Sequence, residues 1–425
     1  MKKLTLKNGL RILLDPDKNA KTASICMTVG VGSRMESPEQ AGISHFVEHM
    51  LYSGTTSRSR SDINDQISAM SASYNGETSK EYTRYYFQVL ENQQEAAADL
   101  LFDMLLHPAF DPKETAVERG IICSELDMRD GGQSPVGYLM DNIWPKSQLV
   151  ASTGGVRETV SKITPDTLRA FMAKYYVPER MVFSACGKLN EGLLLRKIKN
   201  QFGKLPNTKN PISAEPAPCK RFIQKIPQLS DKLALGLCFP TFGSRDERYY
   251  ALDILEHIIS SSPSGRLFAR IREELGLVYS IRSGKVSFLN EGIFAIEMVV
   301  DADNEITALL EIGAILYDIK TNGVTQKEFQ RAKHQLTDTL TMDLDNNLYC
   351  AIANGEDELL YNGALGHAEK LKKYNSVTLQ EVNRLAAELI DFTQTSLVAA
   401  GSSPCDSDFY KSILDELEVL NKEKK

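Results

Sequence analysis

The sequence predicts an α+β protein with two homologous domains, each a mainly antiparallel sheet with helices packed on one face. Three observations support this class: the length, a proline-rich segment near the middle, and similar motifs on its two sides. A chain of 425 residues is too long for one compact core, so two domains of roughly 200 residues each are expected. Apolar residues make up 42% and charged residues 25%, as in ordinary globular proteins.

The middle of the chain contains one clear linker. Residues 205–220 hold four prolines and no hydrophobic period, which is typical of a domain boundary. We therefore expect a first domain at 1–207, a linker at 208–221 and a second domain at 222–425.

Similar motifs on the two sides of this linker indicate an internal duplication. A Gly-Ser-Arg motif that starts at residue 32 precedes a helical pattern ending in Glu-His at 48–49. The same motif at residue 243 precedes a pattern that contains Glu-His at 256–257. Such self-similarity predicts two copies of one fold, related by a pseudo-twofold axis.

Alternating apolar residues predict the strands. The stretch from Leu4 to Leu13 reads as two short strands joined at Asn8-Gly9, a common hairpin turn pair. Long amphipathic helical patterns separate the later runs. Alternation favours antiparallel sheets with one face against helices. The clearest later runs are 22–32, 82–90, 181–187 and 293–300.

The composition excludes several classes of protein. The formal net charge is -7, and no basic run precedes the terminal tail, unlike in a nucleic-acid binder. No stretch approaches the ~18 apolar residues of a membrane span. Seven cysteines without a CxxC pair argue against a disulfide framework and for a reducing compartment. No signal peptide is evident, so we expect a bacterial cytoplasmic protein or, alternatively, a mature organelle protein without its transit peptide. In either case we expect no nucleic-acid or membrane partners.

The sharpest chemical feature is the motif His-Phe-Val-Glu-His at residues 45–49. It lies on a predicted helix from Gln40 to Tyr52. Positions i and i+4 share one face of a helix, so His45 and His49 can bind one ion. Glu48 lies beside them and can hold an attacking water. This arrangement is the inverted form of the HExxH zinc helix.

A catalytic zinc site needs three protein ligands and one open position, so a third ligand is expected on another element. Glu118 and Glu125 lie two turns apart on a second predicted helix. They share a face, and either can reach the ion. The remaining histidines have no partner at ligand spacing and are read as structural; they are His107, His257, His334 and His367.

Motifs along nearly the whole chain resemble the pitrilysin or insulin-degrading-enzyme family of inverted zincins. The likeness is closest to short two-domain members similar to the mitochondrial processing peptidase β subunit. Six motifs carry it: LxNGLRI, GSRxE, HFVEHMLYSGT, YNGETSKEYTRYY, ERGIICSEL and SGRLFARIREELGLVYSI.

This resemblance implies a zinc-dependent metallopeptidase with one Zn²⁺ per chain. His45, His49 and Glu125 would be the ligands and Glu48 the general base. Glu118 matches the family's nearer glutamate, which orients ligands.

In the second half of the chain, the counterparts of the two glutamates are Ala332 and Thr339. That degenerate copy should bind no zinc. It would instead supply Phe268, Arg272 and Tyr279, which match a family pattern whose arginine and tyrosine contact substrate near the scissile bond. By the same resemblance, Phe268 is expected to bind substrate. From the residues alone, a structural role for Arg272 and Tyr279 is the simpler interpretation.

The resemblance also implies how substrate binds. The segment Asn75, Gly76, Glu77 and Thr78 would form a sheet edge onto which an extended peptide adds as a strand. Folded proteins should therefore resist cleavage. The family often has alanine in place of Gly76, which can alter the adjacent subsite. Glu77 either favours basic substrate side chains or is a solvated strand charge.

The expected function is a zinc metalloendopeptidase that hydrolyses unfolded peptides, such as leader or targeting peptides or peptide fragments. By resemblance, two chains would close as a clam-shell homodimer. One alternative is a subunit that is active only with an inactive homologous partner. Another is a non-catalytic structural subunit, as in the core of the respiratory bc1 complex. The complete metal motif weighs against the structural alternative.

Overall fold

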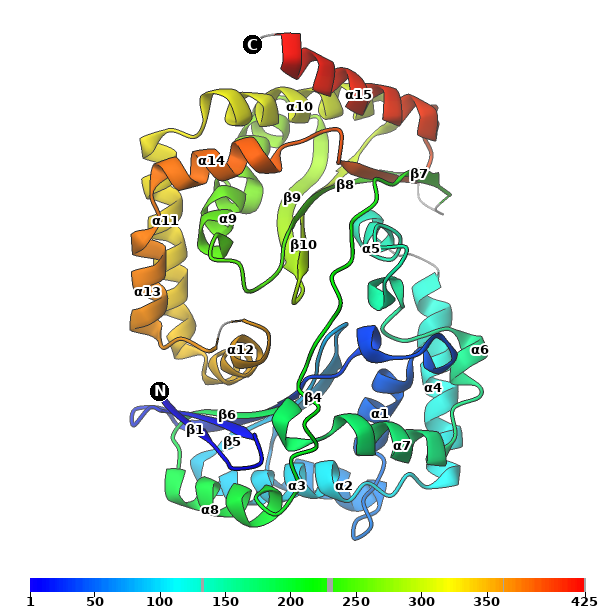
Figure 1. Ribbon diagram of the computed structural model, residues 1–425, viewed down its shortest axis with the longest axis vertical. Helices are drawn as coiled ribbons and strands as arrows, with labels where there is room; N and C mark the ends of the chain where they lie inside the picture. The colour runs from blue at the N-terminus through cyan, green and yellow to red at the C-terminus, as the bar shows by residue number, and fades with distance from the viewer. Residues whose placement is uncertain (131–133, 228–231, 362, 424–425) are drawn as a thin grey trace. The chain divides into compact units, whose positions relative to one another are not determined.

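The computed structural model describes residues 1–130, 134–227, 232–361 and 363–423. Over these residues the chain forms two compact units, each with its own sheet and core (Figure 1). The predicted α+β class with two similar domains is confirmed. Unit 1 comprises residues 1–127, 151–214 and 342–366, and unit 2 comprises residues 128–150, 215–341 and 367–425.

Unit 1 is built on a sheet which, counted over the described residues, has six strands in the order β1-β2-β6-β3-β5-β4. Pairing is antiparallel except between β2 and β6, so the sheet is mixed. The predicted hairpin joins β1 to β2, and Gly9 has a φ of 95° there, which favours glycine. The strands are β1 (Lys2–Thr5), β2 (Arg11–Pro16), β3 (Thr22–Val29), β4 (Ser73–Thr78), β5 (Thr83–Leu90) and β6 (Met181–Gly187).

Most helices of unit 1 cover one face of this sheet. Their apolar sides and the inward residues of the strands form one core, which includes Ile25, Phe46, Leu101 and Phe183. Burial of these side chains is the main stabilising contribution to the unit. The helices are α1 (Ile43–Leu51), α2 (Arg60–Ala69), α3 (Gln94–Leu106), α4 (Pro112–Asp130), α6 (Arg157–Val160), α7 (Pro165–Tyr175) and α8 (Glu191–Phe202).

One helix from the second half of the sequence covers the other face of the unit 1 sheet. In α12 (Asn347–Leu360), Ala351 packs against Cys26 and Cys186. Gly355 allows this approach, because a Cβ there would lie 2.5 Å from Thr28 Oγ1. The strands β3 and β6 are therefore buried along both faces. This second layer differs from the helices expected on one face only.

Unit 2 repeats the plan with a sheet in the order β7-β11-β8-β10-β9. Here β7 and β11 run parallel, and the other neighbours are antiparallel. The parallel pair again makes the sheet mixed. The strands are β7 (Ile223–Ile226), β8 (Leu233–Phe242), β9 (Val278–Ser287), β10 (Glu291–Val300) and β11 (Ser396–Ala400).

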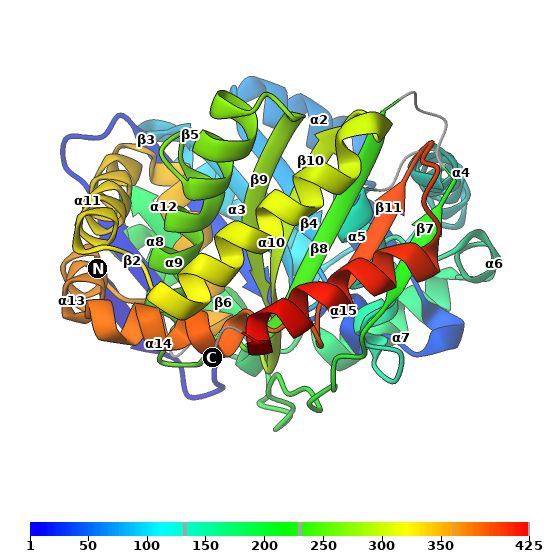
Figure 2. The same ribbon diagram turned by 90° about the horizontal axis from the view of Figure 1, so that it is seen from above.

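The helices of unit 2 also divide between the two faces of its sheet. Figure 2 shows α10 and α15 lying across one face. A short helix from the first half of the sequence, α5, covers the other face, where Leu139 packs near Cys238 and Ile293. Gly236 permits this contact, because a Cβ there would lie 2.9 Å from Pro135 Cβ. The helices are α5 (Pro135–Met140), α9 (Tyr249–Glu256), α10 (Glu305–Asn322), α11 (Gln326–Met342), α13 (His367–Ser376), α14 (Leu379–Leu389) and α15 (Ser407–Glu423).

The two units thus exchange one helix each. The helix α5 precedes the proline-rich segment but belongs to unit 2, and α12 follows that segment but belongs to unit 1. The contiguous domains expected at 1–207 and 222–425 differ from the compact units by these exchanged segments. In the part of the chain that the structure describes, no helix combines the length and apolarity that a membrane span requires.

Candidate metal centre

The helix α1 places both histidines of the motif on one side. It begins at Ile43 rather than at Gln40, since Gly42 has a φ of 93° and interrupts the helix. The apolar side of α1 is buried in the core, which fixes the direction of the opposite side. There His45 Nε2 and His49 Nε2 lie 3.2 Å apart, as the i, i+4 spacing predicts.

Glu125 approaches the two histidines from α4. Its Oε2 lies 3.8 Å from His45 Nε2 and 3.7 Å from His49 Nε2. A tetrahedral zinc ion with bonds of about 2.1 Å holds its ligand atoms about 3.4 Å apart. The three measured separations are close to that value, so these residues fit zinc. Over the described residues, these three form the one cluster of His, Cys, Asp or Glu with metal-binding spacing.

Glu118 lies behind His49 rather than in the cluster. Its Oε2 is 2.9 Å from His49 Nδ1, and its Oε1 accepts a hydrogen bond of 3.0 Å from Ser53 and pairs with Arg60 at 2.6 Å. Burial raises the pKa of Glu118, but the bonds from His49 and Arg60 outweigh it and lower the pKa overall. The carboxylate stays charged and fixes the ring of His49, which leaves Nε2 to bind a metal.

His45 is neutral near pH 7. Burial and the neighbouring His49 lower the pKa of His45 to about 4. A neutral imidazole is the form that binds a metal ion. Burial lowers the pKa of His49, but the carboxylates of Glu118, Glu48 and Glu125 outweigh it and raise the pKa overall. Together these carboxylates suit a divalent cation.

Glu48 lies beside the cluster and faces strand β4. Its Oε2 is 3.9 Å from His45 Nε2 and accepts a hydrogen bond of 3.1 Å from Thr78 Oγ1. Burial raises the pKa of Glu48, and His49 and Thr78 partly offset that effect. An ideal Cβ on Gly76 would lie only 2.4 Å from Glu48 Oε1. The carboxylate thus occupies the space that the side chain of residue 76 would fill.

Strand β4 is the edge of the unit 1 sheet and carries four of the five predicted substrate-binding residues. It pairs with β5 alone among the described strands, with Asn75 opposite Tyr86. Glu77 is neither free nor simply solvated. It forms an ion pair with Arg84, which also binds Glu356 of α12 at 3.0 Å. Arg84 therefore compensates part of the negative charge at this edge.

The second predicted group lies on unit 2. Arg272 belongs to the wide helical turn Phe268–Glu274, and its guanidinium lies 4.8 Å from the centre of the Phe268 ring. Tyr279, on β9, is 78% exposed. The tyrosine is thus not packed under its strand, and its ring and hydroxyl are available for contact.

In unit 2, the copy of the motif forms hydrogen bonds and an ion pair within the chain. His257 Nε2 lies 2.9 Å from Gln335 Oε1 on α11, where unit 1 has the helix that carries its glutamates. Lys285 pairs with Asp253, which also accepts a hydrogen bond of 2.8 Å from Tyr374. No metal cluster is present here within the described residues.

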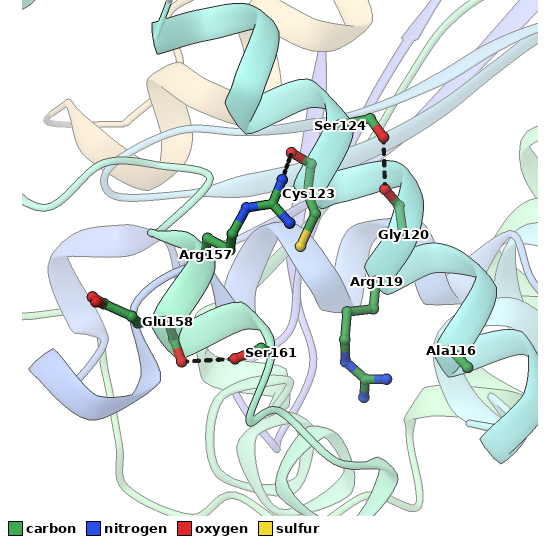
Figure 3. Close-up of a pocket in the computed structure, with 8 residues that line it drawn as sticks. All are labelled: Ala116, Arg119, Gly120, Cys123, Ser124, Arg157, Glu158 and Ser161. Carbon is green, nitrogen blue, oxygen red and sulfur yellow. Dashed lines mark hydrogen bonds between the residues drawn. The ribbon is translucent and has the colours of Figure 1, made fainter.

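A groove of about 740 Å³ lies between α4 and α6, separate from the residues predicted for the site (Figure 3). Several polar groups that line it bind the chain itself. Arg157 donates to the carbonyl of Cys123 at 3.4 Å, and Ser161 donates to that of Glu158 at 3.0 Å. The groove therefore does not change the identification of the site.

Three residues that support the centre were not predicted from the sequence: Ser53 and Arg60, which bind Glu118, and Glu36, which binds the start of α1. Glu36 accepts hydrogen bonds from the backbone of Gly42 and Ser44 at 2.7 and 2.8 Å and so caps α1. No spacing signals these residues, because each reaches the site through a loop or a separate helix. The capping role was detectable only as an acidic residue shortly before a helix.

Two family models together match most of the chain. Residues 11–153 match the model described as "Insulinase (Peptidase family M16)". Residues 162–336 match the model described as "Peptidase M16 inactive domain". The first match contains all residues of the metal cluster.

Individual relatives extend over nearly the whole chain. The uncharacterized zinc protease YmxG of Bacillus subtilis is 31% identical over 411 residues, which cover 95% of this chain and 100% of the relative. A probable mitochondrial-processing peptidase subunit beta of Arabidopsis thaliana is 26% identical, covering 93% of this chain and 77% of that protein. The crystal structure of a protease from Helicobacter pylori has the same fold, with a TM-score of 0.85, 19% identity, and coverage of 94% and 99%.

Proposed function

Since the chain belongs to peptidase family M16, the pitrilysin and insulin-degrading-enzyme family, we propose that it is a zinc-dependent endopeptidase that hydrolyses unfolded peptides. One observation carries the proposal. His45, His49 and Glu125 converge at zinc-binding separations, with Glu48 directly beside them. A structural subunit would need the fold but not this complete set.

The residues of the chain divide the chemistry among them. His45, His49 and Glu125 would hold one zinc ion, which when bound supplies Lewis-acid polarisation of the scissile carbonyl. Glu48 takes a proton from the attacking water and transfers it to the leaving amine. Glu118 keeps His49 in position through the hydrogen bond between its carboxylate and Nδ1 of His49.

The proposed substrate is an extended peptide. The free edge of β4 offers backbone groups of Asn75 and its neighbours, to which a peptide strand can add. Only a chain without tertiary structure can present such a strand. Leader or targeting peptides and peptide fragments meet this requirement.

Arg272 and Tyr279 are proposed to contact the substrate at the developing oxyanion. Their exposure and the absence of an ion pair to Arg272 among the described residues support this role. We propose a homodimer in which the metal centre of one chain works with Arg272 and Tyr279 of its partner. The same surface would allow a heterodimer with an inactive homologue.

The proposed compartment is the bacterial cytoplasm. All seven cysteines are free thiols, which suits a reducing environment. The Bacillus subtilis relative is consistent with a bacterial source.

The test is cleavage of a quenched basic peptide by purified protein, run beside Glu48→Gln and with zinc content measured for both. We expect the wild type to cut, a chelator to abolish cutting, and Glu48→Gln to keep its zinc while losing at least about 10³-fold in kcat. The matched control is Glu256→Gln, the equivalent substitution in unit 2, which should leave cleavage unchanged. A zinc-loaded wild type that cuts no member of a peptide library would contradict the proposal.

A further inference from the structure

We propose that Thr78 is a positioning residue for the Glu48 carboxylate and that the missing side chain of Gly76 makes room for it. The inference rests on the proposed function, because Glu48 matters only if the site hydrolyses peptides. It assigns to strand β4 a second role beside peptide binding, which is to hold the general base.

Two adjacent inward positions of β4 carry this inference. Side chains alternate along a strand, so residues 76 and 78 face the same side, toward α1. Thr78 Oγ1 donates a hydrogen bond of 3.1 Å to Glu48 Oε2. Among the described residues, this is the one hydrogen bond to the Glu48 side chain. Without it, the carboxylate would keep its rotational freedom within the site.

Gly76 contributes space rather than backbone freedom. Its φ is not in the left-handed region, so the backbone would accept any residue. Glycine is unfavourable inside a strand, which points to a close approach. An ideal Cβ would meet three atoms of Glu48, with Oε1 at 2.4 Å, Cγ at 2.8 Å and Cδ at 2.9 Å. A methyl group at this position would therefore push against the end of the Glu48 side chain, which is flexible and would shift within the site.

This arrangement couples two parts of the proposed mechanism. A peptide that adds to the edge of β4 takes its register from the backbone of that strand. The general base takes its position from two residues of the same strand. The distance between the scissile bond and the base is thus set by one element, and near-attack geometry is sensitive to shifts of about 1 Å.

The test compares three substitutions by steady-state kinetics. Thr78→Val keeps the shape and strand propensity but removes the hydroxyl, and we expect kcat to fall about 10-fold or more with KM within about 2-fold. Thr78→Ser restores the donor and should restore most of kcat. Gly76→Ala should shift the carboxylate but lower kcat less than Thr78→Val, because the flexible Glu48 side chain can move away from a methyl group. Ser73→Ala, which removes an exposed hydroxyl from the same strand, is the matched control and should have no effect.

Two readouts separate positioning from other roles. Zinc content should stay at the wild-type level in each variant, because no ligand is touched. In the Glu48→Gln background, Thr78→Val should neither lower the residual rate further nor weaken peptide binding. An additive loss would show that Thr78 acts independently of Glu48 and would overturn the inference.

Crystal structures decide the question independently of activity. In Thr78→Val and Gly76→Ala, the Glu48 carboxylate should leave its wild-type position while the three ligands stay in place. An unmoved carboxylate would overturn the inference even if the variants lose activity. If the wild type cuts no peptide, the proposed function fails, and the same structures still show whether Thr78 and Gly76 position Glu48.

Discussion

Glu118 connects His49 to residues outside the metal motif. It bonds His49 on one side and Ser53 and Arg60 on the other. Arg60 is held in turn by Glu114, whose Oε2 lies 2.7 Å from its Nε. The orientation of one ligand thus depends on a side chain from α2, a helix that contributes nothing else to the centre.

We predict that Glu118→Gln weakens zinc binding by about 10- to 100-fold. The substitution removes the charge that stabilises the His49 ring and breaks the pair with Arg60. Competition with a chromogenic chelator measures the affinity directly. Glu114→Gln is the control, since Glu114 pairs with Arg60 but does not touch His49. Equal losses in the two variants would show that Arg60, and not the bond to His49, is responsible.

At the residue scale, the sequence predicts what spacing encodes. The i, i+4 pair His45 and His49 follows from helix geometry. Glu118 and Glu125 are equivalent by spacing, and only the resemblance to a family distinguishes the expected ligand from the residue that orients it. The pairing of Arg84 with Glu356 could not be predicted. Glu77 lies opposite Arg84 in the pair of β4 and β5, but Glu356 is distant in sequence, and no motif connects a strand to a helix from the other half of the chain.

At the element scale, α1 depends on a buried cap. Glu36 is 3% exposed and accepts hydrogen bonds from the backbone of Gly42 and Ser44. Burial raises the pKa of Glu36 to about 7, even though the backbone bonds act in the other direction. The folded protein therefore binds a proton at Glu36 in a pH range where the unfolded chain does not.

We predict that the free energy of unfolding contributed by Glu36 falls as pH rises from about 4.5 to about 7. In this range the native state binds more protons than the unfolded state, so the free energy of unfolding decreases as pH rises. The decrease over the whole range is about 3 kcal/mol. Glu36→Gln removes the titrating group, so its free energy of unfolding should decrease less over the same pH range. Denaturant unfolding at pH 5 and pH 8, with chelator present to exclude metal linkage, measures the difference. Parallel pH profiles for the two proteins would contradict the assignment.

The packing of α12 gives a second prediction at this scale. Gly355 has Thr28 Oγ1 within 2.5 Å of an ideal Cβ, whereas Gly120 on α4 has nothing within 4 Å. Gly355→Ala should destabilise the protein by about 1–3 kcal/mol through overpacking. Gly120→Ala should stabilise it by up to about 1 kcal/mol through helix propensity. Thermal midpoints of the two variants test the pair, and a stabilising Gly355→Ala would show that α12 can move away.

The same helix explains where prediction of the fold stops. Alternation identified the ranges of β3 and β6, but both strands are buried on two faces. Their second face carries small residues such as Ser24 and Ser184, which resemble solvent-facing positions in a sequence. The covering helix lies far along the chain, so local patterns could predict the strands but not their second layer.

At the scale of the whole molecule, each unit depends on a segment from the other half of the sequence. α5 and α12 each cover a sheet from the opposite side, and in each case a glycine permits the contact. The internal duplication is thus retained in packing as well as in topology. The metal centre lies on unit 1 and Arg272 lies on unit 2. Their cooperation can therefore be tested by mixing chains that carry different substitutions.

We predict that two inactive variants restore activity when they form mixed dimers. In a dimer of Glu48→Gln with Arg272→Ala, one metal centre keeps Glu48 and faces the intact Arg272 of the partner. Random exchange of subunits makes about half of the dimers mixed, each with one intact site, so about a quarter of wild-type activity should return. Light scattering should give twice the chain mass of 47.3 kDa.

The control mixes Glu48→Gln with His45→Ala, which removes one of the three metal ligands. Both substitutions lie in unit 1, so every metal centre in the mixture is defective and no activity should return. If Glu48→Gln with Arg272→Ala also stays inactive after confirmed subunit exchange, cooperation between chains is excluded. A monomeric mass together with full wild-type activity would have the same consequence, because a single chain would then contain everything that cleavage requires.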